Sequence, residues 1–484
     1  MDRNYLIFIV IIVFLQGCAT GHKYIKPENE LQKTFIGSSE TKGILPQTKP
    51  LKNWWQSFND PVLDRLVNEG QNRNISLKIA GERIKAARSY QAAVASSKVP
   101  SVSLGFGFSA FQLSENDPLL GPAFAMTNPV NGGNLLERRG SGFLAGALIS
   151  WEPDIFGRIG QRVKAAEIRA EETAIFREAV VVMMTSDIIY NYLELRGSQC
   201  RLDIADSNIE KQRKILEIVK TNYENGLASE LDVAKAEALL AATESIKPKL
   251  ELAEKAHIFR IAILLNKDNK ELIDILSVHK KLPVMKENIP VGLPSDLLKR
   301  RPDIKIAERE MAASDADLAA AVANRYPRFV ISGGPGLHAE NMGDFFSGGS
   351  DIYGFGAGIK WDLFDGGLRK SMKKAASANF EASALLYELS VKKAVSEVEI
   401  TLVNYTKTQD FALSVKTADK KSEKVLEKVA ALYSAGLIGH LDLLAAQREK
   451  NNISDLEVVS RLQTVNAVLS LYKALGGNWE DKAQ

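Results

Sequence analysis

Residues 101–109 read SVSLGFGFS, and small and apolar side chains alternate strictly along them. Because successive side chains of a strand point to opposite faces, the serines and glycines share one face. The other face carries Val102, Leu104, Phe106 and Phe108. About ten residues with one apolar face are typical of a strand in a transmembrane barrel. A soluble sandwich strand alternates in the same way, so this stretch alone leaves both interpretations open.

Three further segments carry the same alternation. They are residues 143–151, residues 353–362 and a run that begins at Phe329. Gly333, Gly334 and Pro335 interrupt the last of these, so we expect the weakest strand there. Trp151 and Trp361 stand at the ends of strands, as in the aromatic girdles of membrane barrels. The sequence therefore predicts four strands with a membrane-type pattern.

The chain is a tandem duplication. An offset of 227 residues aligns Pro100 with Pro327, together with the helical segments before them. An offset of 210 residues aligns a longer block that starts at Trp151 and Trp361. That block also pairs Tyr223 with Tyr433, Gly226 with Gly436, and Asp232 with Asp442. The offset falls by 17 residues between the blocks, so the loop between the strands is longer in the first repeat.

Each repeat reads as a short helix, two strands, a long helix and a returning helix. We expect short helices at 61–98 and 295–325, and long helices at 158–222 and 368–432. Asp60 before Pro61 is a predicted N-cap. A helix of about 65 residues spans roughly 100 Å. The returning helices should end near Asn266 and Gly476, and Pro248 should kink the first of them.

The N-terminus has the pattern of a lipoprotein signal peptide. Its one continuous apolar run, Tyr5–Leu15, rises only about 16 Å as a helix, roughly half of a membrane core. The run leads into Gly17-Cys18-Ala19, which resembles a bacterial lipobox. Cys18 would then become the lipidated first residue of the mature chain, and Ala19 after it favours the outer membrane. The other cysteine, Cys200, lies in a helical pattern and is predicted to pack there.

These features divide the chain into six predicted segments. They are a signal peptide (1–17), a lipidated N-terminal segment (18–60), the first repeat (61–278), an equatorial linker (279–294), the second repeat (295–476) and a C-terminal tail (477–484).

Composition and motifs argue against an enzyme or a nucleic-acid-binding protein. The formal net charge is +3, which gives no electrostatic reason for a nucleic-acid partner. The five histidines are scattered, without metal-ligand spacing. The glycines at 354, 356 and 358 lack dinucleotide-binding spacing. We therefore expect no catalysis, no metal and no cofactor beyond the covalent lipid.

Four strands per chain cannot close a barrel. Lipid tolerates no open sheet edge, because each unpaired backbone group there costs several kcal/mol. The smallest bacterial outer-membrane barrels have about eight strands. Several copies must therefore share one barrel, and helices near 100 Å long must project beyond the bilayer. This reasoning does not fix the number of copies.

The chain resembles the TolC-like outer-membrane factors, in the lipoprotein branch that serves efflux pumps. The resemblance lies in Trp54-Trp55 through Asp60-Pro61, in LPSDLLKRRPDI at 293–304, in WDLFDGG at 361–367 and in both Tyr-x-x-Gly turns. It implies a mainly helical homotrimer with a 12-stranded β-barrel and a periplasmic tunnel of long antiparallel helices. It also implies an exit duct that works with a periplasmic adaptor and an inner-membrane transporter of the RND type. The alternative is a lipid-anchored periplasmic coiled-coil scaffold without a pore.

The two helical turns are the candidate functional sites. The resemblance implies that these turns contact the adaptor, and exposed leucines at loop tips, which are otherwise unfavourable, support such a contact. The residues concerned are Gly226, Leu227, Ser229, Gly436 and Leu437.

Resemblance also implies a periplasmic gate, in which Asp232 pairs with Tyr433 and Asp442 lines the constriction. Ile438 and Ala445 depart from the family, which has an Arg and a second Asp there, so the gate should have fewer polar contacts. Without a gate, Asp232 and Asp442 are ordinary charges at helix N-termini.

Overall fold

The computed structural model describes residues 24–27, 31–39, 43–46, 53–114, 116, 139–285 and 288–477. The predicted signal peptide and Cys18 lie outside the described residues. The chain forms two compact units, one around the strands and one around the helical hairpins. In the described ranges, no helix combines the length and the apolar content needed to cross a membrane.

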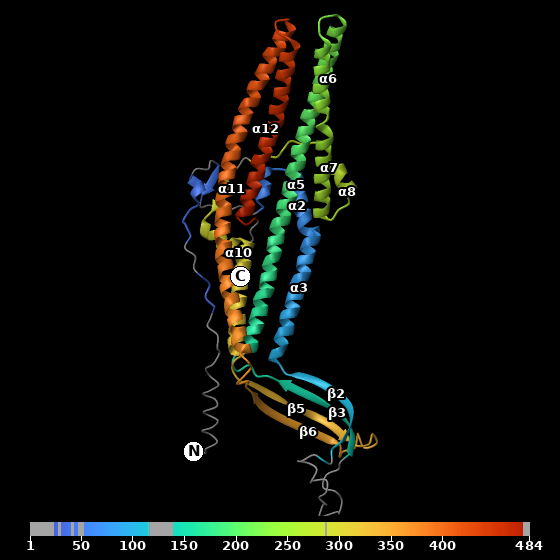
Figure 1. Cartoon of the computed structure of the whole chain (residues 1–484), viewed down its shortest axis with the longest axis vertical. Coiled ribbons are helices and arrows are strands. Elements are labelled where there is room, and N and C mark those ends of the chain that lie inside the picture. The colour runs from blue at the N-terminus through green and yellow to red at the C-terminus, as the bar shows by residue number, and fades with distance from the viewer. Residues whose placement is uncertain are drawn as a thin grey trace, which may run out of the picture. The chain divides into compact units, whose positions relative to one another are not determined.

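The four predicted strands form one antiparallel sheet. Its strands are β2 (Ser101–Gln112), β3 (Arg139–Trp151), β5 (Arg328–Ala339) and β6 (Asp351–Lys360), side by side in this order (Figure 1). The strand expected to be weakest, β5, is continuous through Pro335, which pairs with Tyr353. It lies between β3 and β6, so partners on both sides hold it.

The strand register separates two faces of the sheet. Phe106 lies opposite Ala145 and Phe108 opposite Phe143, and Phe329 lies opposite Ile359, all on one face. The other face carries mainly serine and glycine, with Ser103 opposite Leu148. The alternation predicted from the sequence is therefore kept across all four strands.

Two equivalent tryptophans tie the sheet to the helices before it. The Trp151 indole N–H donates to the carbonyl oxygen of Lys98 at 3.0 Å. The Trp361 indole N–H donates to that of Arg325 at 3.2 Å. Lys98 and Arg325 are related by the 227-residue offset, and the two tryptophans by the 210-residue offset. The duplication is thus visible in matching hydrogen bonds.

The first short helix differs from the prediction. Asp60 caps α2 (Pro61–Arg73) as expected, but α3 (Ile75–Ala95) is a separate helix followed by a 3-10 turn at Ser96–Lys98. Asn74 separates them because its side chain accepts from the Leu77 amide at 3.2 Å. The same side chain donates to the Leu264 carbonyl at 2.7 Å.

The long hairpin of the first repeat follows the prediction. Helix α5 (Arg158–Glu224) is followed by α6 (Glu230–Glu244), α7 (Lys247–Leu265) and the short α8 (Asn269–Leu276). The returning helix breaks between α6 and α7, where Pro248 occupies the first turn of α7. Figure 1 shows α6 and α7 running back beside α5.

The second repeat has an unbroken return. Its elements are a 3-10 turn (Pro294–Asp296), α9 (Leu297–Arg300), α10 (Pro302–Ala323), α11 (Leu368–Ser434) and α12 (His440–Ala474). Arg301 makes the contacts that give the LPSDLLKRRPDI motif a structural role. Its guanidinium donates to the Ala474 carbonyl at 2.7 Å and forms ion pairs with Asp303 at 2.8 Å and Glu397 at 2.6 Å. The motif therefore joins α10 to both α11 and α12.

The segment before α2 packs on the helices of the same unit. Its 3-10 turns span Ile36–Ser39 and Trp54–Phe58, and β1 (Ile44–Pro46) pairs in parallel with β4 (Ile289–Gly292). The Ile36 and Gly37 amides donate to the Glu399 carboxylate at 2.7 and 2.8 Å. The buried Trp54 stacks on Tyr472 with centroids 4.2 Å apart.

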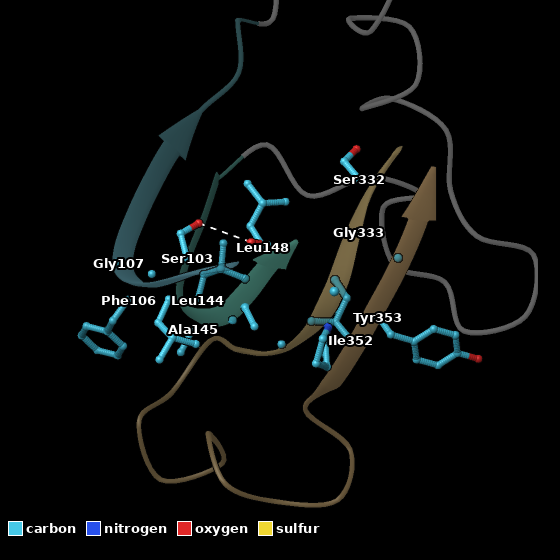
Figure 2. A pocket seen from close by; sticks show the side chains of 18 residues that line it. Ser103, Phe106, Gly107, Leu144, Ala145, Leu148, Ser332, Gly333, Ile352 and Tyr353 are labelled. Carbon is cyan, nitrogen blue, oxygen red and sulfur yellow. Dashed lines mark hydrogen bonds between the residues drawn. The ribbon is translucent and has the colours of Figure 1, made fainter. Parts of the chain in front are cut away.

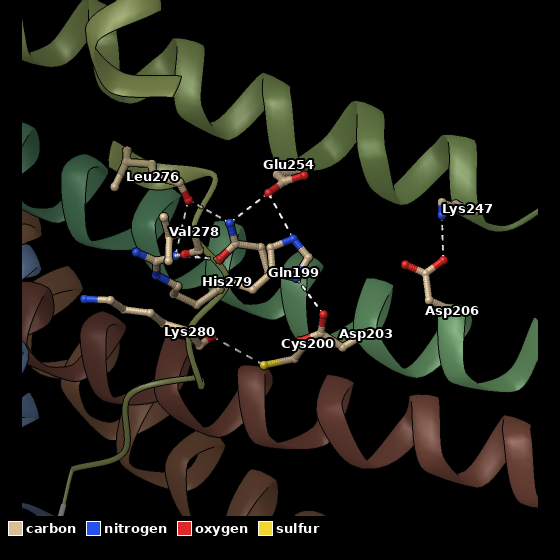
Figure 3. A network of polar contacts seen from close by, with 11 residues as sticks. Gln199, Cys200, Asp203, Asp206, Lys247, Glu254, Leu276, Val278, His279 and Lys280 are labelled. Carbon is tan, nitrogen blue, oxygen red and sulfur yellow. Dashed lines mark hydrogen bonds and ion pairs between the residues drawn. The ribbon is translucent and has the colours of Figure 1, made fainter. Parts of the chain in front are cut away.

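A polar network fixes the chain after α8 to α5 and α7 (Figure 3). The His279 ring lies between Asp203, with Nδ1 at 2.6 Å, and Glu254, with Nε2 at 3.5 Å. Cys200 is a free cysteine whose thiol meets the Lys280 carbonyl at 3.8 Å.

Candidate functional site: the helical turns and the sheet

The two helical turns have the same backbone geometry. Gly226 and Gly436 adopt left-handed φ values of 75° and 69°, which favour glycine. The amide of Leu227 donates to the carbonyl of Asn222 at 2.7 Å, and that of Leu437 to the carbonyl of Leu432 at 3.0 Å. These bonds close the ends of α5 and α11.

Both turns present a leucine to solvent, as the sequence predicts. Leu227 is 78% exposed and Leu437 is 71% exposed. Neither side chain is needed for the turn, whose hydrogen bonds are made by the backbone. An apolar side chain this exposed at the tip of each hairpin is available to a partner.

Asp232 acts as a helix cap. Its carboxylate accepts from the Ser229 amide at 3.0 Å and from the Ser229 hydroxyl at 2.7 Å, while the Ser229 oxygen accepts from the Asp232 amide at 3.3 Å. The Ser229 hydroxyl and then the Ser229 amide lower the pKa of Asp232. This is a capping box at the start of α6. In the second turn Gly439 takes the capping position and has no side chain to do the same.

The predicted hydrogen bond between Tyr433 and Asp232 is absent from the described part of the chain. The Tyr433 hydroxyl instead accepts from the Asn222 side-chain amide at 3.4 Å. The reason is local, because Ser229 lies three residues before Asp232 and engages its carboxylate. The contact between the two hairpins at this point is therefore neutral rather than charge-assisted.

His440, which the sequence analysis did not single out, is buried at the second turn. It is the first residue of α12, only 8% exposed, and its ring lies against Tyr433 with centroids 5.4 Å apart. Neither ring nitrogen has a hydrogen-bond partner among the described residues. Burial lowers the pKa of His440, and the charge of Asp232 opposes that shift. Its repeat counterpart, Glu230, is exposed, so the duplication does not predict burial at this position.

Asp442 is exposed at the third position of α12. Within the described ranges its carboxylate has no hydrogen bond or ion pair. The side chain is therefore available to ions or to another copy of the chain, unlike Asp232.

The sheet curves around a hollow of about 730 Å³ (Figure 2). All four strands line it, and its lining is mainly glycine, serine and aliphatic residues, together with the aromatic Phe106 and Tyr353. The Tyr353 ring points away from the other labelled side chains (Figure 2). No cluster of three or more potential metal ligands occurs in the parts of the chain that the structure describes.

A family model described as "Outer membrane efflux protein" matches residues 66–258 and 293–477. The chain belongs to the outer membrane efflux protein family. This result confirms the resemblance to TolC-like factors and the prediction of an outer-membrane exit duct for efflux. Relatives in this family are channels and transport proteins.

Individual proteins agree with this assignment. Nodulation protein T of Rhizobium leguminosarum bv. trifolii is 26% identical over 477 residues, covering 98% of this chain and 97% of that protein. Outer membrane protein OprJ of Pseudomonas aeruginosa is 26% identical over 480 residues, covering 98% and 95%. The solved structure of the outer-membrane channel OprN has 29% identity and a TM-score of 0.86, covering 96% and 100%. The Campylobacter jejuni CmeC channel, at 20% identity and a TM-score of 0.85, shares the fold.

Proposed function

We propose that three copies of this outer membrane efflux protein close one 12-stranded β-barrel, and that their long helices form a periplasmic tunnel. The proposal rests on the four-stranded sheet, whose edge strands β2 and β6 have no outer partner among the described residues. In lipid each unpaired backbone group costs several kcal/mol, so both edges need partners. A threefold ring joins β6 of one copy to β2 of the next.

In this assembly the chain serves as a conduit, and we assign it no catalytic role. It receives cargo from a periplasmic adaptor and an inner-membrane transporter of the RND type. The exposed Leu227 and Leu437 support adaptor docking, because a trimer would present six such apolar tips on one ring.

Docking at the turns is tested by crosslinking the adaptor to single-residue variants in cells. Leu227→Ser and Leu437→Ser should reduce the crosslinked yield. Leu252→Ser is the matched control, because Leu252 is 69% exposed but lies on α7, away from the turns. Equal yields in all three variants would contradict docking at the turns.

A covalent lipid on Cys18 would add a second attachment to the outer membrane. Several acyl chains on one residue bind far more firmly than a single chain. Mass spectrometry of the mature N-terminus decides this point, since an unmodified Cys18 or a different first residue would contradict acylation.

The gate is proposed at the second turn. Asp442, whose carboxylate has no partner among the described residues, would occur three times around the axis of the trimer. Acidic rings attract cations in channels, so this ring should favour cations and disfavour anions. The hydrogen bond between Asn222 and Tyr433 replaces the Asp232 contact as the link between hairpins.

One experiment separates the duct from the scaffold alternative. Purified protein in mild detergent should be a trimer by native mass spectrometry, and it should conduct ions in a planar bilayer. A lipid-anchored scaffold would bind membranes through Cys18 without conducting. A monomer, or a membrane-bound trimer without conductance, would contradict the duct.

A further inference from the structure

The small-residue face of the sheet carries charge of only one sign. Counting alternate residues along β2, β3, β5 and β6 from the observed register, the charged side chains on this face are Arg328 and Lys360. The four described strands place no Asp or Glu on it. Asp351 and Arg139 both fall on the opposite, apolar face, where they pair with Leu337 and Gln112.

Arg328 and Lys360 are direct cross-strand partners. They form the terminal pair of the β5–β6 ladder. Like charges directly opposite one another destabilise a sheet, so this pairing is unfavourable unless a counter-charge is present. Within the described ranges neither side chain forms an ion pair. The Arg328 guanidinium donates to the neutral Asn324 side chain, at 3.0 Å.

The acidic residues that follow β3 and β6 in the sequence, at the same end of the sheet as the basic pair, are already engaged. Glu152 pairs with Arg158 at 2.7 Å, and Asp362 pairs with Arg369. Asp154 accepts from two backbone amides at the start of α5. These acidic residues therefore do not neutralise the two positive charges of Arg328 and Lys360. An anion on the small-residue face could interact with both side chains.

We propose that Arg328 and Lys360 form a basic ring inside the barrel that binds anions. This rests on the proposed trimer, in which the small-residue face lines the duct and the pair occurs three times. Six positive charges around one water-filled section raise the local concentration of anions, because a low-dielectric wall focuses the field. Charges in one ring reinforce each other when they lie within the Debye length, about 8 Å at physiological salt.

The ring is tested by block of single-channel current with tripolyphosphate, using the full-length protein in a planar bilayer. The variant Arg328→Gln/Lys360→Gln should need about tenfold more tripolyphosphate for half-block, the low end of the effect of charge-lined clefts. Arg328→Lys/Lys360→Arg keeps both charges and should be blocked like the wild type. Arg139→Gln removes a basic residue from the apolar face and should also behave like the wild type.

The possible results distinguish failure of the basic ring from failure of the proposed exit duct. If the wild type conducts but the double Gln variant is blocked at the wild-type concentration, the basic ring is wrong and the duct stands. Equal loss of block in Arg139→Gln would also contradict the ring, because net charge alone would then explain the effect. A wild type that never conducts would overturn both the ring and the duct.

Discussion

Removing the Asp60 carboxylate should destabilise the helical unit more than loss of an ordinary helix cap does. One Asp60 oxygen accepts from the Val62 and Leu63 amides at 2.9 and 3.4 Å. The other accepts from the Tyr192 hydroxyl at 2.5 Å. Tyr192 is fully buried, and burial followed by the bond to Asp60 raises the pKa of its phenol. Asp60→Ala therefore removes a cap and leaves the buried Tyr192 hydroxyl, which donates to Asp60, without its acceptor.

The expected loss in the free energy of unfolding is the sum of the lost helix cap and the unsatisfied Tyr192 hydroxyl. A lost N-cap costs about 1 kcal/mol, and an unsatisfied buried hydroxyl costs about 1–3 kcal/mol. We expect Asp60→Ala to lower the free energy of unfolding by about 2–4 kcal/mol in total. In the Asp60→Ala background, Tyr192→Phe should cost little or restore stability, because it removes the orphaned hydroxyl.

The assay is a double-mutant cycle by urea denaturation of the purified protein. Tryptophan fluorescence is a suitable signal, because Trp54 and Trp55 are buried in the same unit. Asp64→Asn is the matched control. Asp64 lies on the same helix, but one of its carboxylate oxygens is buried without a partner, so its neutralisation should not destabilise. A coupling energy between Asp60 and Tyr192 below about 0.5 kcal/mol would refute the reasoning.

Three further outcomes are expected. Burial, followed by the charge of Arg260, lowers the pKa of His257 to about 4 from 6.5. The unfolded chain therefore binds the proton first, and the free energy of unfolding should fall by up to about 3 kcal/mol per chain as pH drops from 6.5 to 4. His257→Gln should flatten this dependence in denaturation curves measured across that range, and an unchanged slope would contradict the assignment. Asp442→Ala should weaken block of single-channel current by trivalent cations. Asp232→Ala should not, because the Asp232 carboxylate is engaged as a helix cap. Equal effects of the two variants would argue against an acidic ring at Asp442. Cys18→Ser should abolish acylation but leave a trimer in native mass spectra, since the barrel has its own affinity for the membrane. Loss of the trimer would contradict this expectation and make the lipid essential to assembly.

Much of the fold could be predicted because the signals are local and occur twice. Alternation marked all four strands, and the 210-residue offset placed Trp151 and Trp361 at equivalent sheet ends. Pro248 predicted a kink in the first returning helix, and the structure interrupts that helix just before Pro248, between α6 and α7. Such features depend on a residue and its neighbours in sequence, so they can be read from the chain alone.

The missed features depend on distant contacts or on competition between partners. Asn74 ends α2 because its side chain also reaches Leu264, far away in sequence. Asp232 is held by Ser229, so the charge-assisted bond to Tyr433 does not form. Arg328 and Lys360 become neighbours only through the register of β5 and β6, which alternation does not fix.

The most direct test of the exit duct is the accumulation of a pump substrate in cells. The cells should contain the transporter and adaptor that co-purify with this chain, with the chain itself present or deleted. We predict that deletion raises accumulation to the level of a transporter-null strain, and that restoring the wild-type chain lowers it again. Accumulation that is unchanged by deletion, in cells where the wild-type trimer is detected in the outer membrane, would contradict the exit duct.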